Sequence, residues 1–312
     1  MAESRVVVYG AMAGNTAIAI TKFIVAGITG SSSMLSEAIH STVDTGNSVL
    51  LLVGMKRSKR KGDAEHPFGY GREIYFWSLI VAILIFGLGG GMSIYEGIQH
   101  IRHPEPLTDP KWNYIVLAAA AVFEGISFGI AIHAVFKAKG KEPFFKALHD
   151  SKDPSTFTVV AEDSAALAGL AIAAIGVFAS HYFEMPVLDG AASVAIGLLL
   201  AAVAVVLIWE SRGLLVGEGM DKNTARAVRD MVEEDPMVMK SGFPLTMYLG
   251  PEEVLMTLDV EFKNDMPAEQ VFESVRRIES AIRARFKRVK RIYIEANPQA
   301  VRAQAERLGG SR

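Results

Sequence analysis

A histidine and an aspartate stand four residues apart in a long run of small and apolar residues. They are His40 and Asp44, within the segment 35–47. On an α-helix such residues share one face, one turn apart, and Asn47 continues that face toward the next turn. Ionisable side chains cost roughly 2.5–3.5 kcal/mol each inside a membrane helix, and they often mark an ion or proton path. A polar seam that joins two helices is the alternative interpretation.

A second group of ionisable residues interrupts the apolar stretch 159–166, where Glu162 and Asp163 are adjacent. Neighbouring residues of a helix point about 100° apart, so one carboxylate can face His40 and Asp44 while the other faces a different helix. An imidazole and three carboxylates suit tetrahedral Zn²⁺, and Mn²⁺, Fe²⁺ or Co²⁺ accept the same ligand types. The alternative for the two acids is a water-filled vestibule without metal.

Other polar residues are candidates for a secondary metal site or a proton path. Glu37 lies one turn before His40, and Glu124 lies midway along another apolar segment. Each could instead be a hydrogen-bonded helix contact. Asp63 and His66 could bind a metal ion on the cytoplasmic side or simply shape a loop. We interpret the histidines near the ends of the apolar segments as surface residues: His100, His103 and His181.

The composition indicates a membrane protein with a charged appendage. Half of the 312 residues are hydrophobic, the mean hydropathy is +0.27, and the apolar residues concentrate in the first two thirds. The net charge of −2 points to no particular partner. The chain has no cysteine, which excludes a disulfide framework and thiolate metal ligands.

Six segments are long enough to span a bilayer, which takes about 20 mainly apolar residues. They cover about 6–28, 33–55, 74–99, 112–136, 156–180 and 187–209. Lysine and arginine concentrate after the second and fourth segments, around 56–72 and 137–152. The positive-inside rule therefore predicts that these loops and both termini are cytoplasmic.

Several further expectations concern the membrane part. We expect the first span to be retained rather than cleaved as a signal peptide. A bacterial plasma membrane is the simplest location, and an organelle membrane is the alternative. Gly87 and Gly91, spaced as Gly-x-x-x-Gly in the third span, could allow close helix approach within a protomer or across a dimer. The alternative is that these glycines add flexibility without such a contact. Membrane topology accounts for the basic run 59–61, so we predict no nucleic-acid partner.

The last third of the chain has the pattern of a small α+β domain. Periodicity predicts helices over 221–234 and 267–286, and strands over 245–249, 254–262 and 289–295. The predicted order is α-β-β-α-β. We therefore divide the chain into a transmembrane transport domain (1–212), a cytoplasmic domain (213–298) and a polar tail (299–312). The cytoplasmic domain has neither histidine nor cysteine, so it lacks the usual soft ligands of a zinc sensor.

These residues together resemble the cation diffusion facilitator family of divalent-metal transporters. The resemblance rests on His40-x-x-x-Asp44, on Asp163 followed by Ser164, on the segment His66-Pro-Phe-Gly-Tyr-Gly-Arg72, and on six spans followed by a small domain. It implies a homodimer that exchanges Zn²⁺ or a similar ion for protons, with a ferredoxin-like cytoplasmic domain.

The resemblance also implies a transport site. It places the ligands at His40, Asp44 and Asp163. Many members have a fourth ligand one turn before the span-five aspartate, but Val159 occupies that position here. The adjacent Glu162 and Asp163 are similar to the branch that includes the mitochondrial zinc transporter nine, so Glu162 is the candidate fourth ligand.

We therefore predict an efflux transporter that moves a divalent cation, foremost zinc, by alternating access in exchange for protons. Metal binding requires neutral His40 and ionised carboxylates, so it releases protons. A metal-conducting channel and a metal-sensing membrane protein are the alternatives. An intramembrane enzyme is disfavoured. The chain has no His-Glu-x-x-His, and its Gly125-x-Ser127-x-Gly129 lies within the apolar segment 112–136 and not at the strand-to-helix turn that a serine nucleophile needs. We expect no cofactor; the metal ion and protons are substrates, and the lipid bilayer is the surrounding partner.

Overall fold

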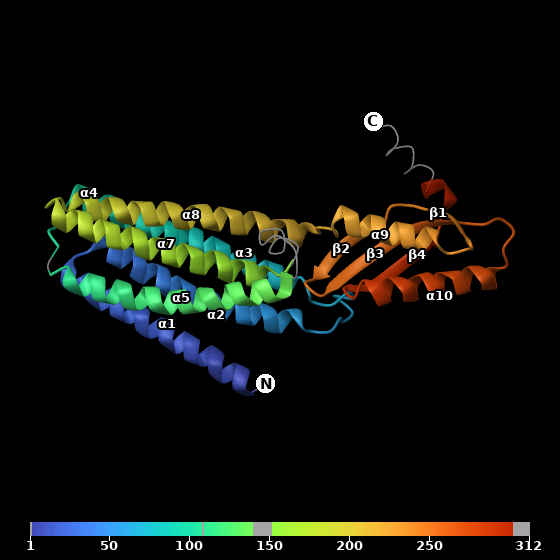
Figure 1. Cartoon of the computed structure of the whole chain (residues 1–312), viewed down its shortest axis with the longest axis horizontal. Helices are drawn as coiled ribbons and strands as arrows, with labels where there is room; N and C mark the ends of the chain where they lie inside the picture. Colours follow the sequence, from blue (N-terminus) through green and yellow to red (C-terminus); the bar gives the residue numbers. More distant parts are fainter. Residues whose placement is uncertain (1, 108, 140–151, 302–312) are drawn as a thin grey trace. The chain divides into compact units, whose positions relative to one another are not determined.

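The computed structural model of the chain describes residues 2–107, 109–139 and 152–301 (Figure 1). The chain divides into two compact units. One comprises residues 1–57 and 73–212, and the other comprises residues 58–72 and 213–312. Two sets of sequence-based predictions, namely Lys141 and Lys146 of the basic loop and residues 302–312 of the tail, lie outside the described residues.

The first unit is a bundle of long helices that run lengthwise beside one another (Figure 1). All six predicted segments form helices. They are α1 (Ala2–Thr29), α2 (Ser32–Ser58), the combined α3 (Glu73–Leu84), π-helix η1 (Ile85–Gly91) and α4 (Met92–Arg102), α5 (Lys111–Lys139), α7 (Pro154–Tyr182) and α8 (Val187–Val216). Their shared core is aliphatic and includes Leu51, Val81, Leu117, Ala173 and Leu200.

Among the described residues, four helices are both long and apolar enough to cross a membrane. They cover Glu73–Arg102, Lys111–Lys137, Thr156–Tyr182 and Val187–Val216. In α1 the apolar helical part is Asn15–Thr29. The 27 residues of α2 include Glu37, His40 and Asp44, so this helix has the length of a span but a more polar composition.

The turn between α1 and α2 has a conformation that glycine favours. The backbone of Gly30 has φ +70°, and its N–H donates to the carbonyl of Ala26 at 2.9 Å. A glycine in the left-handed region just past the last turn is a common helix end. It allows α2 to begin two residues later and run back along α1.

Small residues bring the third helical segment close to α8, but they differ from the predicted pair. A Cβ on Gly97 would lie 2.6 Å from the carbonyl oxygen of Gly190. A Cβ on Gly90 would lie 3.0 Å from that of Gly197. A Cβ on Gly87 would meet no described atom within 4 Å. A Cβ on Gly91 would meet only the carbonyl oxygen of Phe86, at 3.7 Å, in its own helical segment. Among the described residues, Gly87 and Gly91 therefore bring no second helix of the protomer close, and a contact across a dimer stays a prediction.

The second unit contains a four-stranded sheet whose central strand is β3 (Glu253–Phe262). β3 pairs antiparallel with β1 (Val238–Ser241) and β2 (Leu245–Gly250), and parallel with β4 (Val289–Ala296). Helices α9 (Lys222–Glu233) and α10 (Ala268–Arg285) pack against the sheet.

One face of β3 forms the core of this unit. Val254, Met256, Leu258 and Val260 alternate along the strand and are buried with valines and isoleucines of α9 and α10. Three predicted strands are present, but the predicted order omitted β1. Only four residues long, with a buried–exposed–exposed–buried pattern, β1 gives no alternating signal in the sequence.

Candidate metal site

The His40–Asp44 pair lies inside the helical bundle, as its spacing on α2 predicts. His40 Nε2 lies 3.4 Å from Asp44 Oδ2, and the side chains are 2% and 17% exposed. Among the described residues, neither ring nitrogen of His40 nor Oδ1 of Asp44 has a hydrogen-bond partner. A buried polar atom without a partner is costly unless a ligand or water completes its bonding. The pair therefore has nitrogen and oxygen atoms that are available to coordinate a cation.

Glu162 approaches this pair from α7. Its side chain is buried, and its Oε1 accepts a hydrogen bond of 2.8 Å from Nδ2 of Asn47 on α2. Asn47 is on the same helix as His40 and Asp44, so the contact directs Glu162 toward α2. The sequence could not establish this direction, because adjacent residues of a helix diverge by about 100°.

Asp163 points toward a different helix. Its Oδ2 accepts a hydrogen bond of 2.9 Å from the hydroxyl of Ser127 on α5. Glu124, one turn earlier on α5, is half-buried. Four acids are close enough to interact electrostatically. Asp44 interacts with Glu162 and Glu124, and Asp163 interacts with Glu162 and Glu124. The structure thus gathers acids from α2, α5 and α7 in one region of the bundle.

The gathered side chains do not yet form a closed coordination shell. In the described portion of the chain, no group of three or more histidine, aspartate or glutamate side chains is arranged to hold a metal ion. Asn47 and Ser127 hold Glu162 and Asp163 toward two different helices, α2 and α5. The four predicted ligands lie in one region of the bundle. That they converge on one metal ion stays a prediction.

Glu37 has a partner that the sequence reasoning missed. Nζ of Lys22, on α1, lies 3.0 Å from Oε2 of Glu37 and donates a hydrogen bond of 2.8 Å to the hydroxyl of Ser41. Both charged side chains are almost completely buried, at 1% and 0% exposure. A lysine in the middle of an apolar helix was a signal available in the sequence.

The predicted loop constellation of Asp63 and His66 belongs to the second unit. Oδ1 of Asp63 accepts the backbone N–H groups of Glu65 and His66, and Oδ2 accepts the hydroxyl of Tyr70 at 2.6 Å. The hydrogen bond from Tyr70 is the main cause that lowers the pKa of Asp63 below its usual value. These contacts favour a structural role for the loop, and a metal site there stays a prediction.

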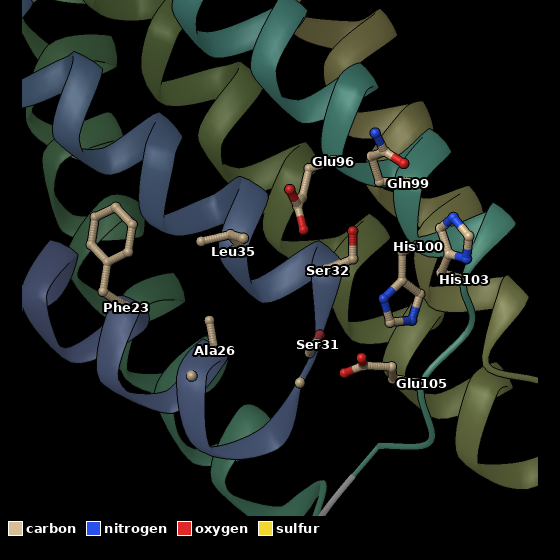
Figure 2. A pocket seen from close by; sticks show the side chains of 12 residues that line it. Phe23, Ala26, Ser31, Ser32, Leu35, Glu96, Gln99, His100, His103 and Glu105 are labelled. Atoms are coloured by element: carbon tan, nitrogen blue, oxygen red, sulfur yellow. The ribbon is translucent and has the colours of Figure 1, made fainter.

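A hollow of about 430 Å³ lies where α1 ends and α2 begins, beside α4 (Figure 2). Glu96, His100 and His103 line it from α4 and its C-terminal cap. His103 and His181 are exposed, as expected. The expectation of a surface position is wrong for His100, which is 9% exposed because it lines this hollow inside the bundle together with residues of the α1–α2 turn.

Asp189, in the first turn of α8, fixes this same turn. Its carboxylate accepts the hydroxyl of Ser31 at 3.0 Å and the backbone N–H of Ser32 at 2.6 Å and of Ser33 at 3.3 Å. The first N–H groups of a helix lack intrahelical partners, and here a carboxylate from another helix supplies them. The sequence reasoning did not single out Asp189, since this cap comes from a residue more than 150 positions away.

Comparison with known proteins gives a consistent assignment. The family model described as the cation efflux transmembrane domain matches residues 8–216. The proton-coupled zinc antiporter SLC30A9, mitochondrial, of Xenopus laevis is 36% identical over 237 residues, which are 75% of this chain and 42% of that protein.

The match to two further relatives covers a larger share of the relative's own length. Metal tolerance protein C4 of Arabidopsis thaliana is 32% identical over 80% of this chain and 55% of its own. Magnetosome protein MamM of Paramagnetospirillum magneticum (strain ATCC 700264 / AMB-1) is 26% identical over 94% of this chain and 88% of its own. The chain spans less than half the length of the SLC30A9 relatives that it matches. The matched domain and these identities show that the chain belongs to the cation efflux family of transmembrane proteins.

Proposed function

We propose that this protein exports a divalent metal cation, foremost Zn²⁺, in exchange for protons. The observation that carries the proposal is the His40–Asp44 pair inside the bundle. Its imidazole nitrogens and Oδ1 have no hydrogen-bond partner among the residues that the structure describes, and Asp44 lies near Glu162 of α7. Relatives named as proton-coupled zinc antiporters support zinc as the substrate and protons as the counter-ion. Family membership agrees with a transporter rather than an enzyme.

The proposed site consists of His40, Asp44, Glu162 and Asp163. Three carboxylates and one imidazole match the hard-to-borderline ligands of Zn²⁺, and Mn²⁺, Fe²⁺ and Co²⁺ are tested beside it. Binding draws Glu162 and Asp163 together from the positions in which Asn47 and Ser127 hold them. These outer hydrogen bonds orient the ligands before the ion arrives.

Proton exchange follows from the same ligands. An imidazole and carboxylates bind a metal only when they are deprotonated, so protons and the metal ion compete for the site. On the more acidic side of the membrane, protonation displaces the ion. Alternating access then exposes the protonated site to the cytoplasm again. Glu37 and Glu124, which lie along the same bundle, are our candidates for a path beside the main site.

The proposed architecture has six spans, with α1 and α2 added to the four apolar helices. Length supports α2 as a span, and its polar face supports a position against other helices rather than lipid. We further propose three domains, with limits 1–212, 213–298 and 299–312, of which the second is ferredoxin-like. The protein is a homodimer in a bacterial plasma membrane, with both termini in the cytoplasm. The order α9, β1 and β2, β3, α10, β4 is consistent with a ferredoxin-like domain whose first strand is interrupted.

The test is metal uptake into proteoliposomes with an imposed pH gradient, for Zn²⁺, Mn²⁺, Fe²⁺ and Co²⁺ in turn. We expect zinc flux that depends on the gradient and is lost in His40→Ala and Asp163→Ala. His133→Ala, at an exposed histidine of α5, is the matched control and should transport normally. Flux that ignores the gradient would indicate a channel. Metal binding without flux of any ion would indicate a sensor.

A further inference from the structure

A complete ion pair lies buried in the helical bundle next to the proposed site. The ammonium of Lys22 reaches Glu37 at 3.0 Å and Ser41 at 2.8 Å. In the ranges that the structure describes, Oε1 of Glu37 has no hydrogen-bond partner. Glu37 therefore contacts Lys22 through one oxygen and keeps the other available.

The bundle makes room for this pair. A Cβ on Gly169 of α7 would lie 2.5 Å from Oε1 of Glu37. The free oxygen thus faces α7, the helix that also contributes Glu162. With a larger residue at position 169, the carboxylate of Glu37 would have to shift from this position.

Helix stability gives no sufficient reason for the pair. Moving two charges out of water costs several kcal/mol for each ion, and apolar replacements of a buried ion pair are often neutral or stabilising. Charged side chains are costly inside a membrane, and ionisable residues there commonly bind or conduct ions or protons. The position of Lys22 supplies such an explanation.

Lys22 lies beside the face of α2 that contains the proposed ligands. Glu37 precedes His40 by three residues and Ser41 by four, and Asp44 follows them by four and three. At these helical spacings the four residues line one side of α2. The charge of Lys22 interacts with His40, Asp44 and Glu124. Because α2 begins at Ser32, Glu37 lies between the site and the α1–α2 turn.

We propose that Lys22 is a positioning residue of the metal path. Its ammonium group binds Glu37 where a metal ion would otherwise bind. Its charge weakens cation binding at His40 and Asp44, and a divalent ion that leaves toward the α1–α2 turn competes with Lys22 for Glu37. Lys22 thus limits the path to one divalent ion and speeds its release. This inference rests on the proposed transport function.

The test uses the full-length protein in detergent and in proteoliposomes. Equilibrium Zn²⁺ binding is measured for wild type, Lys22→Met, Glu37→Gln and the double variant. Lys22→Met should tighten Zn²⁺ binding about tenfold and Glu37→Gln should weaken it about tenfold, since a nearby unpaired charge acts strongly on a divalent ion in a low-dielectric interior. The double variant, which restores charge balance, should bind as wild type does.

Flux measurements add a readout that a structural contact would not affect. Lys22→Met should lower the KM for Zn²⁺ and also lower kcat, because a tightly held ion leaves slowly. Lys22→Arg keeps the charge and should restore both parameters toward wild type. Asn113→Ala is the matched control: it removes another buried polar contact of α1, to Thr29, and should leave the zinc Kd unchanged.

Several outcomes would overturn the inference. If Lys22→Met and Glu37→Gln leave the zinc Kd unchanged, or shift it in the same direction, while both lower thermal stability, the pair is only an interhelical contact. If Lys22→Met does not fold, the question is decided by whether Glu37→Gln weakens zinc binding about tenfold while Lys22→Arg binds as wild type does. If wild type binds no Zn²⁺, the proposed function is refuted. If wild type binds Zn²⁺ and His40→Ala abolishes this binding, the proposed function is supported, and the Lys22 variants then test the role of Lys22 by itself.

Discussion

The side-chain amide of Asn47 donates a hydrogen bond of 2.8 Å to Oε1 of Glu162 and so joins α2 to α7 at the proposed site. Asn47 is completely buried, and Glu162 is nearly so. The contact turns Glu162, and not the adjacent Asp163, toward α2. It leaves Asp163 to the hydroxyl of Ser127 on α5.

Removing this amide should weaken zinc binding. Asn47→Ala leaves Glu162 without its orienting donor, and loss of a group that orients a metal ligand typically costs about 10- to 100-fold in affinity. A zinc titration of the purified protein measures the change. Asn113→Ala, which removes a buried amide beside Thr29 at the end of α1, is the control. Equal zinc affinity in Asn47→Ala and wild type would show that Glu162 is not a ligand or needs no orientation.

The close contact of α4 with α8 should not tolerate one extra carbon. In Gly97→Ala, the new Cβ would meet the backbone of Gly190 at 2.6 Å and of Val194 at 2.7 Å, and backbone cannot move aside as a side chain can. We expect the free energy of unfolding to fall by about 1–3 kcal/mol, as measured by thermal or denaturant unfolding in detergent. Gly87→Ala, where the Cβ enters open space, should not destabilise. A similar loss in both variants would contradict the assigned packing.

The loop of the second unit should show a defined pH response. The hydrogen bond from Tyr70 lowers the pKa of Asp63, so the folded loop is stabilised above the ordinary aspartate pKa and loses that stabilisation as the pH falls through the lowered value. Tyr70→Phe should raise the pKa of Asp63 toward its ordinary value. NMR titration of selectively labelled aspartate carboxylates, assigned with Asp63→Asn, measures this. Tyr293→Phe, at an exposed tyrosine of β4, should have no effect, and an unchanged Asp63 pKa in Tyr70→Phe would refute the assignment.

Asp189 should be important for the turn between α1 and α2. Asp189→Ala leaves the buried donors of Ser31, Ser32 and Ser33 without their acceptor, which should cost about 1–3 kcal/mol of stability. The specific readout is faster hydrogen exchange at the amides of Ser32 and Ser33. Glu105→Ala, at an exposed acid near the same end, is the control. Unchanged exchange at these two amides would show that Asp189 does not cap α2 in solution.

Much of this molecule follows from local pattern. The six helical segments are apparent because apolar and small residues run for the length of a span. The closeness of His40 and Asp44 follows from their spacing of four residues on one helix. The strands around β3 follow from alternation, whereas β1 is too short to show any. Each of these features depends on residues that are near one another in the sequence.

The sequence by itself therefore determined the helices, the types of the candidate ligands and the position of each candidate along its helix. Tertiary structure decided which way Glu162 and Asp163 point, that Lys22 pairs with Glu37, and that Asp189 caps α2 from α8. The physical reason is that helical periodicity fixes the angle between neighbours within a helix but not the rotation of one helix against another. Only packing among α1, α2, α5, α7 and α8 sets those rotations and thereby selects the partner of each buried charge.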